Sequence, residues 1–253
     1  MHDKLFVICY HNIMFTHIID GVRQLLFPDN CLLCRTFLNS NHQQQLCPTC
    51  KAGITCNTAP FCTRCSRHLE HFNEDSLCEI CQGEHLDIDR MWGCCLYQEP
   101  LSQLIYAFKY NGKTALHRTF TQLMQEFITS YHIPINDFDL IAPIPLHPVK
   151  LRERGYNQAE LLSAPLSQHW NVRHEPSLLL RIMATPTQTM LSQKQRWTNT
   201  QGAFKMNPSI SVTDKSILLV DDILTTKATA NAAATALKQA DAAYVGIITL
   251  AIT

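Results

Sequence analysis

Four Cys-x-x-Cys pairs constrain this chain more than any other feature of its sequence. They are Cys31 and Cys34, Cys47 and Cys50, Cys62 and Cys65, and Cys78 and Cys81. Twelve residues separate the first pair from the second, twelve separate the third from the fourth, and the whole unit recurs with an offset of 31. The chain therefore contains an internal repeat at the level of its cysteines.

Each repeat has the ligands for one zinc ion. Two thiolates on a tight turn form half of a tetrahedral site, and a second such turn closes it without an open position, which is typical of structural zinc. The metal then supplies folding energy that so small a unit lacks. Sequential pairing, which we prefer, gives one ion to Cys31, Cys34, Cys47 and Cys50 and the other to Cys62, Cys65, Cys78 and Cys81. A cross-brace that alternates the pairs is the alternative.

The other interpretations of these cysteines are redox motifs, disulfides and reduced core thiols. Matched spacing of four pairs, in a 253-residue chain without an evident export signal, favours metal instead. Cys9, Cys56, Cys94 and Cys95 fall outside the pattern. Cys94 and Cys95 lie in an apolar run, so we interpret them as small buried hydrophobic residues.

Composition sets limits on partners and location. Lys plus Arg and Asp plus Glu number 21 each, so the net charge is zero, which argues against a uniformly basic nucleic-acid binder but leaves room for a local basic patch. The sequence predicts no transmembrane helix and no secretory signal, although Met14 is an alternative start. We expect a cytoplasmic protein that reaches the inner membrane only through partners.

The second half of the chain alternates strands with helices, which predicts a mainly parallel sheet flanked by helices. Strands are predicted at 91–97, 138–146, 177–182, 216–222 and 242–252. Helices are predicted at 101–110, 118–128, 157–170 and 229–240, with Pro165 kinking the third or ending it early. The predicted division is an N-terminal extension at 1–25, a double zinc ribbon at 26–88 and an α/β domain at 89–253.

The segment "ILLVDDILTTKAT", residues 217–229, joins a buried strand to a helix. Ligands of parallel sheets bind beyond the carboxyl ends of strands, where Asp221 and Asp222 are expected. The following turn carries threonine hydroxyls and leads into a helix whose first N–H groups favour an anion. Carboxylates that accept from vicinal hydroxyls, beside a phosphate loop, describe a site for a phosphorylated sugar. The alternative is that the two aspartates merely cap the strand and the helix.

The same segment resembles the phosphoribosyl pyrophosphate motif of type I phosphoribosyltransferases. "LIAPIPLHPVKLRERGYNQAELLS" and "TPTQTMLSQKQRWTNTQGAF" resemble signatures of the ComF/GntX family, which are competence-associated, phosphoribosyltransferase-like proteins. The zinc-ribbon start and "FKYNGK" fit as well. The resemblance covers about residues 25 to 253.

The resemblance implies a type I phosphoribosyltransferase-like fold and a role for each matching residue. Asp221 and Asp222, the implied catalytic pair, would hold the ribose hydroxyls, and "APIPL" at 142–146 would lie near the pyrophosphate, which would bring Mg²⁺ with it. The implied phosphate loop is Thr225, Thr226, Lys227, Ala228 and Thr229. The implied rim donors are Arg152, Arg154, Asn157 and Gln158, with Arg196 on a mobile hood at 187–199. Lys109 and Lys113 are interpreted as solvated.

Lys227 departs from the superfamily pattern, which has glycine at this position of the loop. Glycine permits positive φ and a close approach to phosphate. A left-handed lysine costs roughly 1–2 kcal/mol, partly offset if its ammonium pairs with phosphate, or with Asp221 and Asp222 in the empty site. The departure argues against tight binding and turnover and leaves open whether the protein is an enzyme.

Two functions follow from the resemblance. The first is a competence protein in DNA uptake or utilisation, with a phosphoribosyl pyrophosphate site, association with single-stranded DNA, and other uptake proteins as partners. The alternative is an active phosphoribosyltransferase with an unknown nitrogen acceptor.

Overall fold

The computed structural model describes residues 30–38, 45–70, 76–183, 202–225 and 227–253. The chain divides into two compact units, Met1–Gly53 and Ile54–Thr253. The first unit contains the first cysteine cluster, and the second contains the other cluster together with the α/β sheet. The domain boundary that the sequence analysis places between residues 88 and 89 stays a prediction.

The cysteine repeat is also a structural repeat. In each copy the residue after the second cysteine has positive φ, an antiparallel bridge closes the turn, and a short helix carries the second pair. The matched features are Arg35 and Ser66, the bridges Asn30–Phe37 and Phe61–His68, and the helices α2 (Pro48–Ala52) and α3 (Glu79–Gly83). Each feature recurs at the 31-residue offset of the cysteines.

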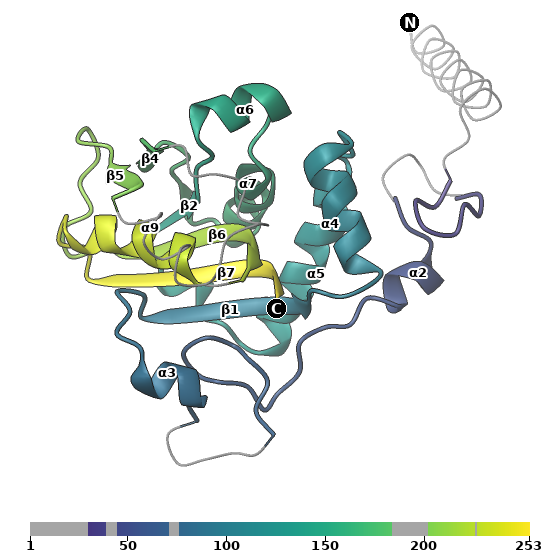
Figure 1. Ribbon diagram of the computed structural model, residues 1–253, viewed down its shortest axis with the longest axis horizontal. Coiled ribbons are helices and arrows are strands. Elements are labelled where there is room, and N and C mark those ends of the chain that lie inside the picture. The colour runs from purple at the N-terminus through teal and green to yellow at the C-terminus, as the bar shows by residue number, and fades with distance from the viewer. Residues whose placement is uncertain (1–29, 39–44, 71–75, 184–201, 226) are drawn as a thin grey trace, which may run out of the picture. The chain divides into compact units, whose positions relative to one another are not determined.

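A five-stranded parallel sheet forms the centre of the second unit, with strand order β1-β7-β6-β2-β3 (Figure 1). Its strands are β1 (Arg90–Leu96), β2 (Leu140–Pro143), β3 (Arg173–His174), β6 (Ser216–Leu224) and β7 (Tyr244–Ile252). The sheet confirms the predicted α/β class, and Cys94 and Cys95 are buried in β1 as expected. The strand predicted at 177–182 is present as β4 (Leu179–Arg181), but it pairs antiparallel with β5 (Phe204–Met206) outside this sheet.

Helices cover both faces of the sheet. The helices of this part of the chain are α4 (Leu101–Tyr110), α5 (Leu116–Ser130), the 3-10 turn η1 (Ile135–Asp137), α6 (Pro148–Arg154), α7 (Gln158–Trp170) and α9 (Ala228–Lys238). The helices α5 and α7 pack together on one face, and α9 covers the other (Figure 1). In the part of the chain that the structure describes, no helix combines the length and the apolar character needed to cross a membrane.

Of the two alternatives for Pro165, a kink in α7 or an early end, the early end is wrong, because the helix continues to Trp170. Proline removes one backbone hydrogen bond from the helix. Leu162 and Leu166, on either side of it, are buried, and α7 packs against β2, β6 and α5. Burial of this face stabilises the helix across the missing bond.

The second cysteine cluster is part of the sheet's hydrophobic core. One contiguous cluster of buried side chains joins its sulfurs to β1, β6, β7 and the alanine face of α9. Among its members are Cys62, Cys65, Cys81, Met91, Ile217, Leu219, Ala233, Ala234, Leu237, Val245 and Ile247. The metal centre and the sheet therefore share a core.

Gly246 lets β7 pass under two aromatic rings, and this gives a test of the core. A Cβ there would lie 2.8 Å from Phe138 Cζ and 2.9 Å from Trp92 Cζ3. Gly246→Ala should lower the free energy of unfolding by about 1–3 kcal/mol, as overpacking does, measured by urea unfolding. Gly83→Ala is the control, since nothing lies within 4 Å of its Cβ. Equal stability of the two variants would contradict this packing.

Candidate functional site

Unequal strand lengths create a cavity at the carboxyl edge of the sheet. Pairing of β6 with β2 ends at Val220 and Pro143, whereas pairing with β7 continues to Leu224. Beyond β2, one side of β6 is open to a cavity of about 680 Å³. Asp221 and Asp222 line it. The sequence predicted both aspartates at the end of the strand. They lie within β6 instead, because pairing with β7 extends this strand to Leu224.

Lys109 on α4 is paired with the carboxylate pair. Its Nζ lies 2.5 Å from Asp222 Oδ2, and the two side chains are 19% and 9% exposed. Burial opposes the ammonium charge, but the attraction of Asp222 outweighs it and raises the pKa of Lys109. The interpretation of Lys109 as solvated is therefore wrong, while Lys113 is exposed as expected.

The carboxyl of Asp221 has a strongly raised pKa. Burial raises the pKa of Asp221 to about 7, and the neighbouring Asp222 carboxylate adds to the rise, while Lys109 opposes it. The backbone N–H of Asp222 donates to Asp221 Oδ1 at 2.8 Å, which fixes the orientation of that carboxyl. Near neutral pH the Asp221 carboxyl therefore titrates inside the cavity.

Lys227, just before α9, has the left-handed backbone that glycine favours at this position of the superfamily's loop. Lys227 is left-handed, with φ 61°, and forms the N-cap of α9 without a side-chain cap. Thr225, Lys227 and Thr229 line the cavity, and Ala228 is the first residue of the helix. Thr226, Arg196 and the hood at 187–199 lie outside the described residues.

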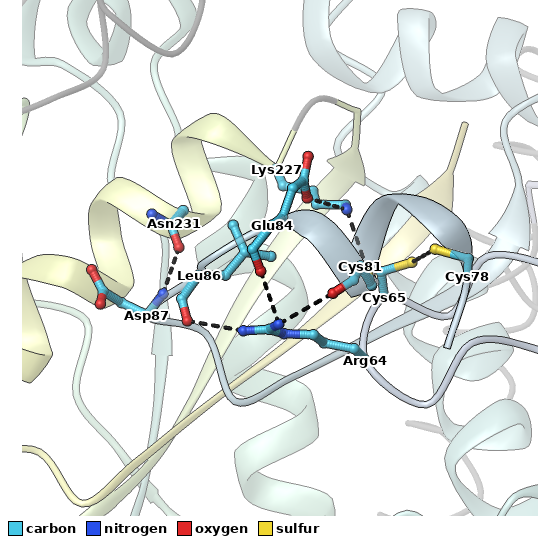
Figure 2. Close-up of polar contacts among 9 residues, drawn as sticks. All are labelled: Arg64, Cys65, Cys78, Cys81, Glu84, Leu86, Asp87, Lys227 and Asn231. Atoms are coloured by element: carbon cyan, nitrogen blue, oxygen red, sulfur yellow. Dashed lines mark hydrogen bonds and ion pairs between the residues drawn. The ribbon is translucent and has the colours of Figure 1, made fainter. Parts of the chain in front are cut away.

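The sequence allowed the ammonium of Lys227 to pair with Asp221 and Asp222 in the empty site, but it has other partners. It lies 2.7 Å from Glu84 Oε2 and 3.5 Å from Cys81 Sγ (Figure 2). Lys109 already occupies the position beside the aspartates. Lys227 thus lines the cavity, while its ammonium group contacts the second cysteine cluster and Glu84.

Three cationic side chains also line the cavity. Lys150, Arg154 and Arg181 line the cavity, whereas Arg152 is exposed on α6 and is not among the lining residues. Burial lowers the pKa of Lys150, and the positive charges of Arg181 and Arg154 lower it further. An anion bound among these groups would relieve both effects.

Sequence reasoning did not assign Lys109, Lys150 and Arg181 to the site. Lys109 and Lys150 stand inside the quoted segments "FKYNGK" and "HPVKLRERG", so a helical projection of each would have directed attention to them. Arg181 gave no signal, because the pairing of β4 with β5 decides its direction.

Asn157 and Gln158 lie together at the start of α7. The Asn157 side chain accepts from Ala159 N at 3.1 Å and donates to the Ile144 carbonyl at 3.1 Å, so it joins α7 to the chain that leaves β2. Gln158 is 3% exposed, lines the cavity, and its Nε2 has no hydrogen-bond partner among the described residues. It is an available donor.

The cysteine sulfurs form two groups of four in sequential order, which confirms the preferred pairing over the cross-brace. Within each group the ligand atoms lie within 4.8 Å of one another, and the Cys34–Cys47 and Cys65–Cys78 sulfur distances are both 3.6 Å. A tetrahedral zinc with bonds of about 2.3 Å needs sulfurs about 3.8 Å apart. Both groups fit a structural zinc ion.

Comparison with known proteins agrees with this geometry. Residues 22–82 match the model of the double zinc ribbon domain. Competence protein F of Haemophilus influenzae is 30% identical over 210 residues, which cover 81% of this chain and 89% of that protein. The chain belongs to the competence protein F family.

Other members of the competence protein F family extend the match. DNA utilization protein YhgH of Escherichia coli K12 is 28% identical over 81% of this chain and 88% of its own length. Competence protein ComFC of Bacillus subtilis is 25% identical over 91% of this chain and 96% of its own length. The match to ComFC thus covers a larger share of this chain, 91%, than the match to competence protein F, 81%.

The raised pKa of Asp221 predicts a pH dependence of stability. The folded carboxyl titrates at about 7 against an ordinary value of 3.8, so this group's contribution to stability is lost as pH rises toward 7. The unfolding free energy of Asp221→Asn minus that of the wild type should rise by about 2–3 kcal/mol between pH 5 and pH 8, at roughly 1.4 kcal/mol per pKa unit.

Urea unfolding across this pH range measures the difference. Asp139→Asn is the matched control, because the pKa of Asp139 is lowered by its hydrogen bond from Ser216 N, so it contributes no such loss between pH 5 and pH 8. A difference between Asp221→Asn and wild type that stays flat with pH would show that Asp221 titrates as an ordinary carboxyl.

Proposed function

We propose that this protein takes part in DNA uptake or utilisation and that its cavity binds phosphoribosyl pyrophosphate with magnesium. The first part is supported by the names of its relatives, competence protein F and DNA utilization protein YhgH. The second part rests on the charge pattern of the cavity.

The observation that carries the proposal is the placing of opposite charges in one cavity. Asp221 and Asp222 line it together with Lys150, Arg154 and Arg181, and the N-terminus of α9 adjoins it. Carboxylates accept hydrogen bonds from vicinal hydroxyls, cations bind phosphate oxygens, and a helix N-terminus favours an anion. A sugar with phosphate groups at both ends satisfies all three. Magnesium would be held chiefly by the diphosphate of such a ligand.

Association with single-stranded DNA is supported by exposed aromatic side chains beside the cavity. Tyr106 and Tyr110 on α4 are 59% and 57% exposed, and their ring centroids lie 5.0 Å apart. The Arg154 guanidinium lies 5.1 Å from the centre of the Tyr110 ring. Exposed rings beside cations are the features on which single-stranded nucleic acids stack.

Calorimetric titration of zinc-loaded protein with phosphoribosyl pyrophosphate and magnesium tests the cavity. Wild type should bind, and the Asp221→Asn, Asp222→Asn double variant should not, because each substitution removes the negative charge and replaces one acceptor oxygen for the ribose hydroxyls by an NH2 donor. Asp139→Asn, an exposed aspartate beside β2 at the other edge of the sheet, should bind as wild type does. Absence of binding by wild type would refute this part of the proposal.

A gel-shift titration with oligothymidine tests the aromatic surface. Tyr106→Ala, Tyr110→Ala should weaken binding about fivefold or more, because base stacking contributes about 1–3 kcal/mol per base. Tyr106→Phe, Tyr110→Phe keeps both rings and should bind as wild type does. Equal binding by the alanine and phenylalanine variants would exclude stacking on this surface.

A second candidate function, phosphoribosyl transfer to a nitrogen acceptor, is favoured by one observation. Asp221 has a pKa of about 7 inside the cavity, which suits a group that accepts and returns a proton near neutral pH. Release of pyrophosphate on addition of nitrogen acceptors would establish transfer. Binding without release would leave the cavity as a binding site.

A further inference from the structure

The loop of the candidate site is joined to the second cysteine cluster by one side chain. Lys227 Nζ donates to Cys81 Sγ at 3.5 Å and to Glu84 Oε2 at 2.7 Å (Figure 2). The Lys227 side chain is only 7% exposed. Cys81 belongs to the cluster that fits a zinc ion, so a residue that lines the cavity also contacts a metal ligand through its ammonium group.

The segment that carries Cys81 and Glu84 is itself held in place. Arg64 donates to the carbonyls of Cys81, Glu84 and Leu86 at 3.5, 3.0 and 3.1 Å (Figure 2). At the end of the segment, Asp87 N donates to Asn231 Oδ1 on α9 at 2.8 Å. The ribbon therefore has a defined position against α9, and Lys227 bridges the two near the first turn of the helix.

The charge of the metal site explains the position of the Lys227 ammonium. A zinc ion with four thiolates has a net charge of −2, and this cluster is buried. A buried charge needs a partner, and groups that hydrogen-bond to metal ligands stabilise the metal they hold. Glycine, the residue that the superfamily pattern has at this position, has no side chain to supply such a partner.

We propose that Lys227 couples the second zinc site to the sugar-phosphate loop. Through its hydrogen bond to Cys81 it stabilises the bound metal, and the metal in turn holds the lysine backbone in the left-handed conformation that begins α9. Zinc at this site then favours ligand in the cavity. Because coupling is reciprocal, ligand in the cavity equally favours retention of this zinc. The coupling to the ligand rests on the proposed function, whereas the contact with the metal site does not.

Zinc release from the full-length protein tests the contact without any sugar ligand. Metal transfer to a chromogenic chelator is followed, and alkylation with peptide mapping identifies which cysteines become free. Lys227→Met should speed zinc loss from Cys62, Cys65, Cys78 and Cys81 by about 10- to 100-fold, as loss of a group that supports metal ligands does. Loss from Cys31, Cys34, Cys47 and Cys50 should not change, so the first site is an internal control.

Two further variants test whether faster zinc release comes from losing the hydrogen bond to Cys81 Sγ or from losing any ion pair of this region. Lys238→Met removes another α9 lysine, which lies 2.7 Å from Asp89 Oδ2, and should leave both release rates unchanged. Glu84→Gln removes the competing carboxylate but keeps the Lys227 donor, so its release rate should stay near that of wild type. The proposed support of the metal site by Lys227 would be wrong if Lys227→Met released zinc at the wild-type rate, or if Lys238→Met accelerated release as much as Lys227→Met does.

The ligand arm uses phosphoribosyl pyrophosphate saturated with magnesium. It should slow zinc loss from the second site in wild type and not in Lys227→Met. If wild type binds the ligand by calorimetry but its zinc release does not change, the coupling is wrong. If wild type binds no ligand, the proposed function fails, and the release rates of the variants still decide whether Lys227 supports the metal site.

Discussion

The parallel pairing of β6 between a short strand and a long one is the constraint on which the candidate site depends. Pairing with β2 stops at Val220, and pairing with β7 continues to Leu224. The last residues of β6 are therefore rigid on one side and open on the other. A carboxylate pair on a strand edge of this kind has both the fixed position and the access that binding requires.

The second ribbon shares the hydrophobic core of the strand that carries this pair. Its buried sulfurs belong to the same core as β6 and the alanines of α9, so the metal centre is packed directly against the sheet and that helix. Alanine on this face of α9 keeps the helix close to the sheet and to the ribbon. Small side chains and buried thiols together allow three elements to meet around one core.

Much of the architecture could be predicted from the sequence, because periodicity and spacing report local structure directly. The 31-residue cysteine repeat predicted two four-sulfur clusters in sequential order, and continuous apolar runs predicted β6 and β7. The side-chain partners in the site could not be found in this way. Lys109 meets Asp222 across 113 positions of sequence, and Lys227 meets Glu84 across 143, and no local pattern encodes a contact of that range. The continuation of α7 through Pro165 also could not be predicted locally. Helix propensity favours an end at proline, and packing against β2, β6 and α5 stabilises the helix beyond it.

The ion pair between Lys109 and Asp222 has a consequence for the order in which charges enter the cavity. A bare divalent cation would meet a carboxylate that already holds an ammonium 2.5 Å away, and it would have to displace a nearly buried lysine at a cost in desolvation. For the ligand proposed above, a cation already surrounded by diphosphate oxygens would meet no such competition, because its ligands would travel with it and Lys150, Arg154 and Arg181 would receive the surplus negative charge. On that proposal, the resident lysine would make the empty cavity discriminate against free metal ions and in favour of metal that arrives as part of an anionic complex.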